Sequence, residues 1–126
     1  MTDFATDLEL IRDAALAAGG LALSGRERGL KNWSKPGGSP VTSADLAVDQ
    51  LLRARLLSAR PDYGWLSEET ADSAERLSKR RIFVVDPIDG TVAYMKDKPW
   101  WCIPIAVVED GQPVAAVIHA PMLNET

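Results

Sequence analysis

The stretch Asp-Pro-Ile-Asp-Gly-Thr at residues 86–91 places two carboxylates three positions apart, directly after the apolar run Ile-Phe-Val-Val at residues 82–85. The β-branched and aromatic residues of that run predict a buried strand, which the proline must end because it has no N–H to donate. Mg²⁺ prefers oxygen ligands, usually one or two carboxylates together with water and phosphate oxygens. Asp86, Asp89 and the carbonyl of Ile88 could therefore bind such an ion, although Asp-Gly also marks an ordinary turn.

Two further stretches carry carboxylates at the ends of predicted elements. Thr42 and Asp45 have the spacing of a capping box, so Asp45 could simply bond backbone N–H groups at a helix start, or it could also face the water shell of a metal. Glu68 and Glu69 could divide the work of binding a metal and polarising water, or form a solvated edge. Lys35 lies in a polar loop and could approach a phosphate, although a lone loop lysine is usually solvated.

Two amphipathic helices are predicted in the first half of the chain. Apolar residues at spacings of three and four run from Asp3 to about Leu23, and again from Thr42 to about Arg60. The pair Gly19-Gly20 weakens the end of the first helix, and periodicity does not decide whether the helix stops there.

Strands predominate in the second half of the chain. Short strands are predicted at residues 64–66 and 82–85, separated by a charged linker at residues 71–81. Asp-Gly between the apolar runs 102–108 and 113–119 predicts a β-hairpin. The order of helix, helix, strand, strand and hairpin predicts an α+β fold, a layered antiparallel sheet with helices on one face.

Three ring-bearing side chains near the C-terminus are expected to be structural. Trp100 and Trp101 are expected to pack, although one of them could wall a ligand pocket. His119 is expected to be a core or edge residue, because the sequence contains no second histidine for a metal pair.

Composition limits the class of protein. The 126 residues, 46% of them hydrophobic and 25% charged, suit one domain with a sizeable core. A net charge of -4 disfavours a nucleic-acid polymer as partner, and no apolar run is long enough to span a membrane. The single cysteine, Cys102, and an N-terminus unlike a signal peptide predict a cytoplasmic location.

Three stretches together closely resemble the inositol monophosphatase superfamily: Ser-Pro-Val-Thr-Ser-Ala-Asp at 39–45, Leu-Ser-Glu-Glu-Thr at 66–70 and the stretch at 86–91. They occur in the order that this family carries them, and the resemblance covers essentially the whole chain. It implies the N-terminal half of a sugar-phosphatase-type αβαβα fold. It also implies a Mg²⁺-dependent phosphomonoesterase that Li⁺ inhibits and whose substrate is a small phosphorylated metabolite.

The matching positions imply a set of metal ligands. Glu68, Asp86 and Asp89 would bind the metal through their carboxylates, and Ile88 through its backbone carbonyl. Glu69 is a further candidate in the same stretch as Glu68.

The resemblance also implies which residues act on water and phosphate. Glu68 and Thr91 would orient the attacking water, and Asp45 would support them through Thr91 or the outer shell of the metal. The backbone amides of Gly90 and Thr91 would hold phosphate oxygens.

Within the superfamily, Leu-Ser-Glu-Glu and Ser-Pro-Val-Thr-x-Ala-Asp look more like the 3'(2'),5'-bisphosphate nucleotidase branch than the inositol branch, where Gly commonly stands at the position of Ser67. The expected substrate is adenosine 3'(2'),5'-bisphosphate, with inositol 1-phosphate or another small sugar phosphate as the alternative. The chain departs from the family at Gly38, where an acidic residue is common, and at residues 92–94, where Val-Ala-Tyr replaces a small polar residue followed by Phe.

The resemblance also implies a part of the fold that residues 1–126 do not contain. Family members are longer and carry a Trp-Asp-x-Ala-Ala-Gly motif whose Asp completes the metal site. We therefore expect residues 1–126 to form one domain, the N-terminal metal-binding part, or else a shortened, non-catalytic metal- or phosphate-binding module. The surface on which the other part packs would be exposed, so a homodimer or other self-association is expected.

Overall fold

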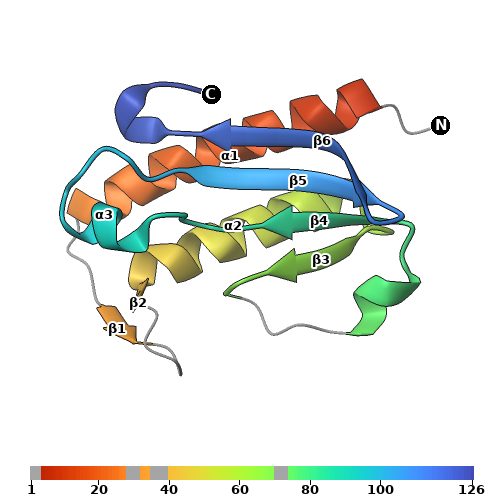
Figure 1. The fold of residues 1–126 in the computed structure, drawn as a ribbon, viewed down its shortest axis with the longest axis horizontal. Helices are drawn as coiled ribbons and strands as arrows, with labels where there is room; N and C mark the ends of the chain where they lie inside the picture. The colour runs from red at the N-terminus through yellow and green to blue at the C-terminus, as the bar shows by residue number, and fades with distance from the viewer. Residues whose placement is uncertain (1–3, 28–31, 35–39, 70–73) are drawn as a thin grey trace.

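The structure, a computed structural model, describes residues 4–27, 32–34, 40–69 and 74–126. A four-stranded sheet lies in front of two long helices in Figure 1, and the core lies between these two layers. The elements follow in the order α1 (Phe4–Glu27), β1 (Asn32–Ser34), β2 (Pro40–Thr42), α2 (Ser43–Ala59), β3 (Gly64–Ser67), η1 (Ala74–Ser78), β4 (Arg81–Val85), α3 (Thr91–Met95), β5 (Ile103–Glu109), β6 (Gln112–His119) and η2 (Pro121–Leu123). The predicted α+β class is confirmed.

Helix α1 continues through Gly19 and Gly20 and ends at Glu27, beyond the predicted end at Leu23. The reason is a close approach between the helix and strand β6. A Cβ atom at Gly19 would lie only 2.7 Å from Nε2 of His119, which is itself buried. The glycine that weakens the helix locally therefore lets it pack against the sheet.

The capping box predicted at the start of the second helix is confirmed. Thr42 is the N-cap of α2, and its side chain and that of Asp45 bond each other's backbone N–H groups. The buried face of the helix carries residues spaced three and four apart: Asp45, Val48, Asp49, Leu52 and Leu56. This face therefore brings two carboxylates, as well as apolar side chains, toward the sheet.

The sheet has the strand order β3-β4-β5-β6 and is mixed. Strands β4, β5 and β6 are antiparallel and include the predicted hairpin, but β3 and β4 are parallel, so the prediction of an antiparallel sheet was wrong for this pair. Parallel neighbours need a crossover connection, and here it includes the 3₁₀ helix η1 inside the segment interpreted as a plain charged linker. Both strands consequently end at the same edge of the sheet.

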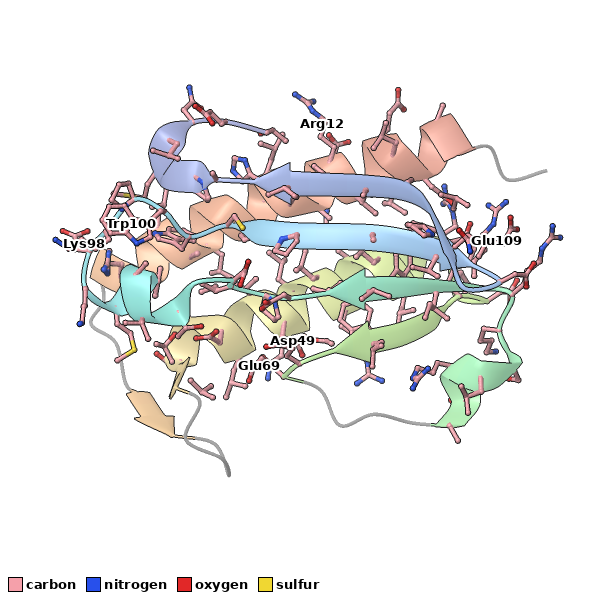
Figure 2. The ribbon with its side chains drawn as sticks, in the orientation of Figure 1. Arg12, Asp49, Glu69, Lys98, Trp100 and Glu109 are labelled. Atoms are coloured by element: carbon pink, nitrogen blue, oxygen red, sulfur yellow. The ribbon has the colours of Figure 1, made fainter. Side chains whose placement is uncertain are left out.

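The two tryptophans of the loop before β5 differ in their surroundings. Trp101 is buried and packs edge-to-face against Tyr94, with ring centroids 4.9 Å apart. Trp100 is 66% exposed and lies beside Lys98 at one end of the molecule (Figure 2), so the packing predicted for it was wrong.

The sheet is apolar on both faces. One face meets α1 and α2, and the other, here called the open face, carries a groove of about 500 Å³. Strand alternation places on the open face the apolar groove residues Leu66, Val84, Pro104, Ala106, Ala116 and Ile118. Sheets with one face in water usually present polar residues there.

None of the helices in the described parts of the chain is long and apolar enough to span a membrane.

A buried ionic network that no sequence pattern predicted connects the N-terminal helix to the sheet. Asp7 is fully buried and accepts hydrogen bonds from Arg60 Nε at 3.0 Å, Tyr63 Oη at 2.8 Å and Arg81 Nη1 at 3.3 Å. Arg81 also donates to Glu109, which lies at the end of the sheet remote from Asp49 and Glu69 (Figure 2).

We expect Asp7→Ala to lower the free energy of unfolding by about 3 kcal/mol, because it leaves two poorly hydrated guanidinium groups without their shared carboxylate. Urea denaturation followed by circular dichroism measures this change. The matched control is Asp13→Ala on an exposed position of the same helix, for which a change within about 0.5 kcal/mol is expected. Equal effects of the two substitutions would contradict a structural role for the network.

Candidate active site

The two parallel strands deliver acidic residues to one edge of the sheet. The ladder between β3 and β4 ends at the pair Ser67 and Val85, and Glu68 and Asp86 follow directly. Both carboxylates line the same end of the groove on the open face. The sequence predicted that each follows a strand, and the parallel pairing brings them together.

The turn at residues 86–91 is fixed by the segment that enters β5. The Asp86 N–H donates to the carbonyl of Pro104 at 3.2 Å, and Asp89 exchanges two backbone hydrogen bonds with Cys102, at 2.8 and 3.0 Å. Gly90 has a φ of 92°, in the region that favours glycine, and a Cβ there would lie 3.2 Å from the carbonyl oxygen of Trp100. The turn therefore has little freedom to rearrange.

Asp45 connects the start of α2 with this turn. Its Oδ2 accepts from the Thr42 N–H at 2.8 Å and the Thr42 hydroxyl at 2.6 Å, and its Oδ1 accepts from the Thr91 hydroxyl at 3.1 Å. The interpretation of Asp45 as a capping residue is confirmed, and its other oxygen contacts Thr91. A role toward the water shell of a metal stays a prediction. Thr91 Oγ1 also lies 3.2 Å from the Ile88 carbonyl, and its single proton can serve one acceptor at a time.

Asp86 lies at the centre of a cluster of negative charge. Partial burial, followed by the negative charges of Glu68, Asp89, Asp45 and Glu69, raises the pKa of Asp86 to about 7. An isolated aspartate has a pKa near 3.9. The ionised carboxylates therefore repel one another, and a bound cation would relieve that repulsion.

The donor chemistry of the cluster suits a hard divalent cation. The carboxylates of Glu68, Asp86 and Asp89 and the carbonyl of Ile88 all offer oxygen atoms, as Mg²⁺ prefers. In the described parts of the chain, no three His, Cys, Asp or Glu side chains lie close enough together to hold one metal ion. The proposed ligand set stays a prediction that rests on the donor chemistry of these residues.

Two site candidates and two missed residues complete the description. Lys35 lies outside the described residues. The backbone N–H of Glu69 donates to Ser67 Oγ at 3.3 Å, and the Ser67 hydroxyl donates to Asp49 on α2. The sequence predicted no role at the site for Ser67 or Asp49, although Asp49 follows Asp45 by four positions, the spacing of one helical face.

This chain is similar to several known proteins in sequence and in structure. The 3'(2'),5'-bisphosphate nucleotidase CysQ of Aggregatibacter actinomycetemcomitans is 39% identical over 94 residues, covering 73% of this chain and 35% of the nucleotidase. The histidinol-phosphatase of Mycobacterium tuberculosis is 41% identical over 91 residues, covering 72% and 34% of the two chains. The crystal structure of the extragenic suppressor protein suhB from Bartonella henselae matches with a TM-score of 0.87 and 29% identity, covering 95% of this chain and 47% of that one.

These similarities define the fold class of the chain. It is an α+β phosphatase fold, of which this chain represents about half. A sequence profile of the inositol monophosphatase family matches residues 5–126, and the chain belongs to that family. It spans about a third of the length of the two relatives named above, and just under half of the solved suhB chain.

The raised pKa of Asp86 predicts how stability depends on pH without divalent cations. Between about pH 4 and about pH 7 the folded chain holds this proton more tightly than the unfolded chain does. The resulting stabilisation is complete below the unfolded pKa and is lost as the pH rises through about 7. We expect the thermal midpoint of Asp86→Asn to fall less over this range than that of the unsubstituted protein, as measured by scanning calorimetry in EDTA. Parallel curves for the two proteins would contradict this assignment.

Proposed function

We propose that this chain forms the metal-binding part of a Mg²⁺-dependent phosphomonoesterase that acts on the 3'(2')-phosphate of adenosine 3'(2'),5'-bisphosphate. The observation that carries the proposal is the negative charge that Glu68, Asp89 and Asp45 place around Asp86, beside the hydrogen bond from Thr91 to Asp45. Similarity to CysQ nucleotidases supports the substrate. The histidinol-phosphatase relative supports a phosphatase of the family more generally.

The position of each residue in the cluster indicates the role that it would have. Glu68, Asp86, Asp89 and the Ile88 carbonyl would hold Mg²⁺, which when bound lowers the pKa of water and neutralises charge on a phosphoryl group. A solved IMPase/NADP phosphatase complexed with Mg²⁺ and phosphate shares this fold, with a TM-score of 0.84 at 20% identity. The proposal of Mg²⁺ as the cofactor rests on the oxygen donors of this chain. We also propose that Li⁺ inhibits the enzyme.

Thr91 and its neighbours would handle water and phosphate. When the Thr91 hydroxyl donates to Asp45, its lone pairs are free to accept a hydrogen bond from a water molecule. Glu68, exposed at the end of β3, would orient that water from the other strand. The N–H groups of Gly90 and Thr91 stand at the start of α3, where backbone donors have no partner within the helix, and would hold phosphate oxygens.

A non-catalytic metal- or phosphate-binding module is the second candidate. It is favoured by the finding that no three potential ligand side chains converge among the described residues. Under this alternative the chain would bind Mg²⁺ weakly and release no phosphate. The two candidates differ in turnover and therefore in a direct assay.

We expect Mg²⁺-dependent release of phosphate from adenosine 3'(2'),5'-bisphosphate, and slower or no release from inositol 1-phosphate. Asp86→Asn and Asp89→Asn should each lower kcat/KM at least about 100-fold, because each removes a charged ligand. A colorimetric phosphate assay measures the rates, and Asp13→Asn on the exposed face of α1 is the control. Full activity in both site variants would contradict the proposed site, and Mg²⁺ binding without turnover would favour the binding module.

We also propose that copies of this chain associate through the open face, and that the protein is cytoplasmic, with neither a nucleic-acid polymer nor a membrane as partner. The open face is apolar, and Ile118 on it is 61% exposed.

Ile118→Asp should shift the protein toward the monomer, because it places a charge on the apolar face through which we propose that the copies associate. Size-exclusion chromatography with light scattering over a range of concentrations measures the shift. Glu125→Asp, an exposed change outside the groove, is the control. An unchanged mass for Ile118→Asp would show that association, if present, uses another surface.

A further inference from the structure

Ser67 and Asp49 form a buried polar pair on the helix side of the sheet. Each is only 6% exposed, and the Ser67 hydroxyl donates its proton to Asp49 Oδ1. The oxygen of the same hydroxyl accepts the N–H of Glu69 at 3.3 Å. A continuous set of hydrogen bonds therefore runs from the backbone of Glu69 to helix α2.

This pair stands where the strand ladder stops. Ser67 is the last residue of β3 that pairs with β4, opposite Val85. Side chains alternate along a strand, so Ser67 faces α2 while Glu68 lines the groove on the open face. Fixing the backbone on both sides of Glu68, at Ser67 and at Glu69, sets the direction in which the Glu68 side chain leaves the strand.

The same helix supports the neighbouring strand in the same way. Asp45 accepts the hydroxyl proton of Thr91 in the turn after β4, and Asp49 accepts that of Ser67 at the end of β3. Asp45 and Asp49 lie one helical turn apart on the buried face of α2. One of them therefore supports the turn after β4, and the other supports the end of β3.

We propose that Asp49 and Ser67 are positioning residues for Glu68, and that they set its distance from Asp86 for metal binding. The inference rests on the proposed function, because it concerns the geometry of that metal site. Asp49 holds the only proton of the Ser67 hydroxyl, so the hydroxyl oxygen must present lone pairs to the Glu69 N–H. Figure 2 shows Asp49 and Glu69 close together at this edge of the sheet.

A purely structural pair would affect stability and leave metal affinity unchanged. The Asp7 network provides the comparison, because it is also buried and ionic but lies at the other end of β4. The effect on Mg²⁺ affinity therefore separates positioning from general stabilisation.

The experiment compares Ser67→Ala, Asp49→Ala and the double variant with the unsubstituted protein. Isothermal titration calorimetry with Mg²⁺ alone gives the affinity, and exchange of the Glu69 amide, followed by NMR without metal, reports the backbone position. We expect each single variant to weaken Mg²⁺ binding about 10- to 100-fold and to speed exchange at Glu69. The Mg²⁺ affinity of the double variant should equal that of the single variant with the lower affinity, because Asp49 acts through Ser67.

Three further variants keep the test decisive. Asp49→Asn keeps an oxygen acceptor for the Ser67 hydroxyl, so its affinity should stay within about threefold of the unsubstituted protein even if Asp49→Ala folds poorly. Ser58→Ala, at an exposed position of α2, and Asp7→Ala should leave Mg²⁺ affinity unchanged.

The outcomes separate this inference from the proposed function. Unchanged Mg²⁺ affinity in Ser67→Ala, together with lost affinity in Asp86→Asn, overturns the positioning role and leaves the function intact. Additive losses in the double variant also overturn the role of Asp49 through Ser67. If the unsubstituted protein binds no Mg²⁺, the proposed function fails and this inference fails with it.

Discussion

The parallel pairing of β3 with β4 is the constraint on which the rest of this structure depends. Two strands that run in the same direction end at the same edge, so Glu68 and Asp86 emerge beside each other at the ends of a paired ladder. Parallel strands also require a crossover, which here passes through η1 and returns the chain to the start of β4. An antiparallel pair would have placed the two carboxylates at opposite ends of the sheet.

The sheet separates two kinds of polar group at this edge. On the open face the carboxylates of Glu68 and Asp86 line the groove, where partial burial and then the negative charge of Glu68 and its neighbours raise the pKa of Asp86. On the helix face, Asp45 and Asp49 are buried and accept hydrogen bonds from hydroxyl groups. Charge that favours a cation thus lies on one side, and the groups that hold it in place lie on the other.

The buried ionic network and the acidic cluster lie at opposite ends of β4. The Asp7 network includes Arg81 at the start of this strand, whereas Asp86 follows its last residue. The five residues of β4 extend about 16 Å, and substitutions at sites so far apart usually act independently. The ionic network around Asp7 stabilises the fold at one end of β4. This stabilisation offsets the repulsion between the carboxylates at the other end.

The sequence alone determined what depends on neighbouring residues. The capping box at Thr42 and Asp45 could be predicted, as could the strand before Asp86 and the β5–β6 hairpin, because caps, strand alternation and Asp-Gly turns act over a few positions. The resemblance carried by these stretches also gave the family correctly.

Only the tertiary structure decided the contacts between distant parts of the chain. Asp7 meets Arg60 and Arg81, which are 53 and 74 positions away, and no spacing in the sequence indicates such pairs. The hydrogen bond between Ser67 and Asp49 likewise joins residues 18 positions apart on different elements. Packing of α1 and α2 against the sheet created these contacts, and the contact of α2 with Ser67 lies beside the acidic ends of the parallel strand pair.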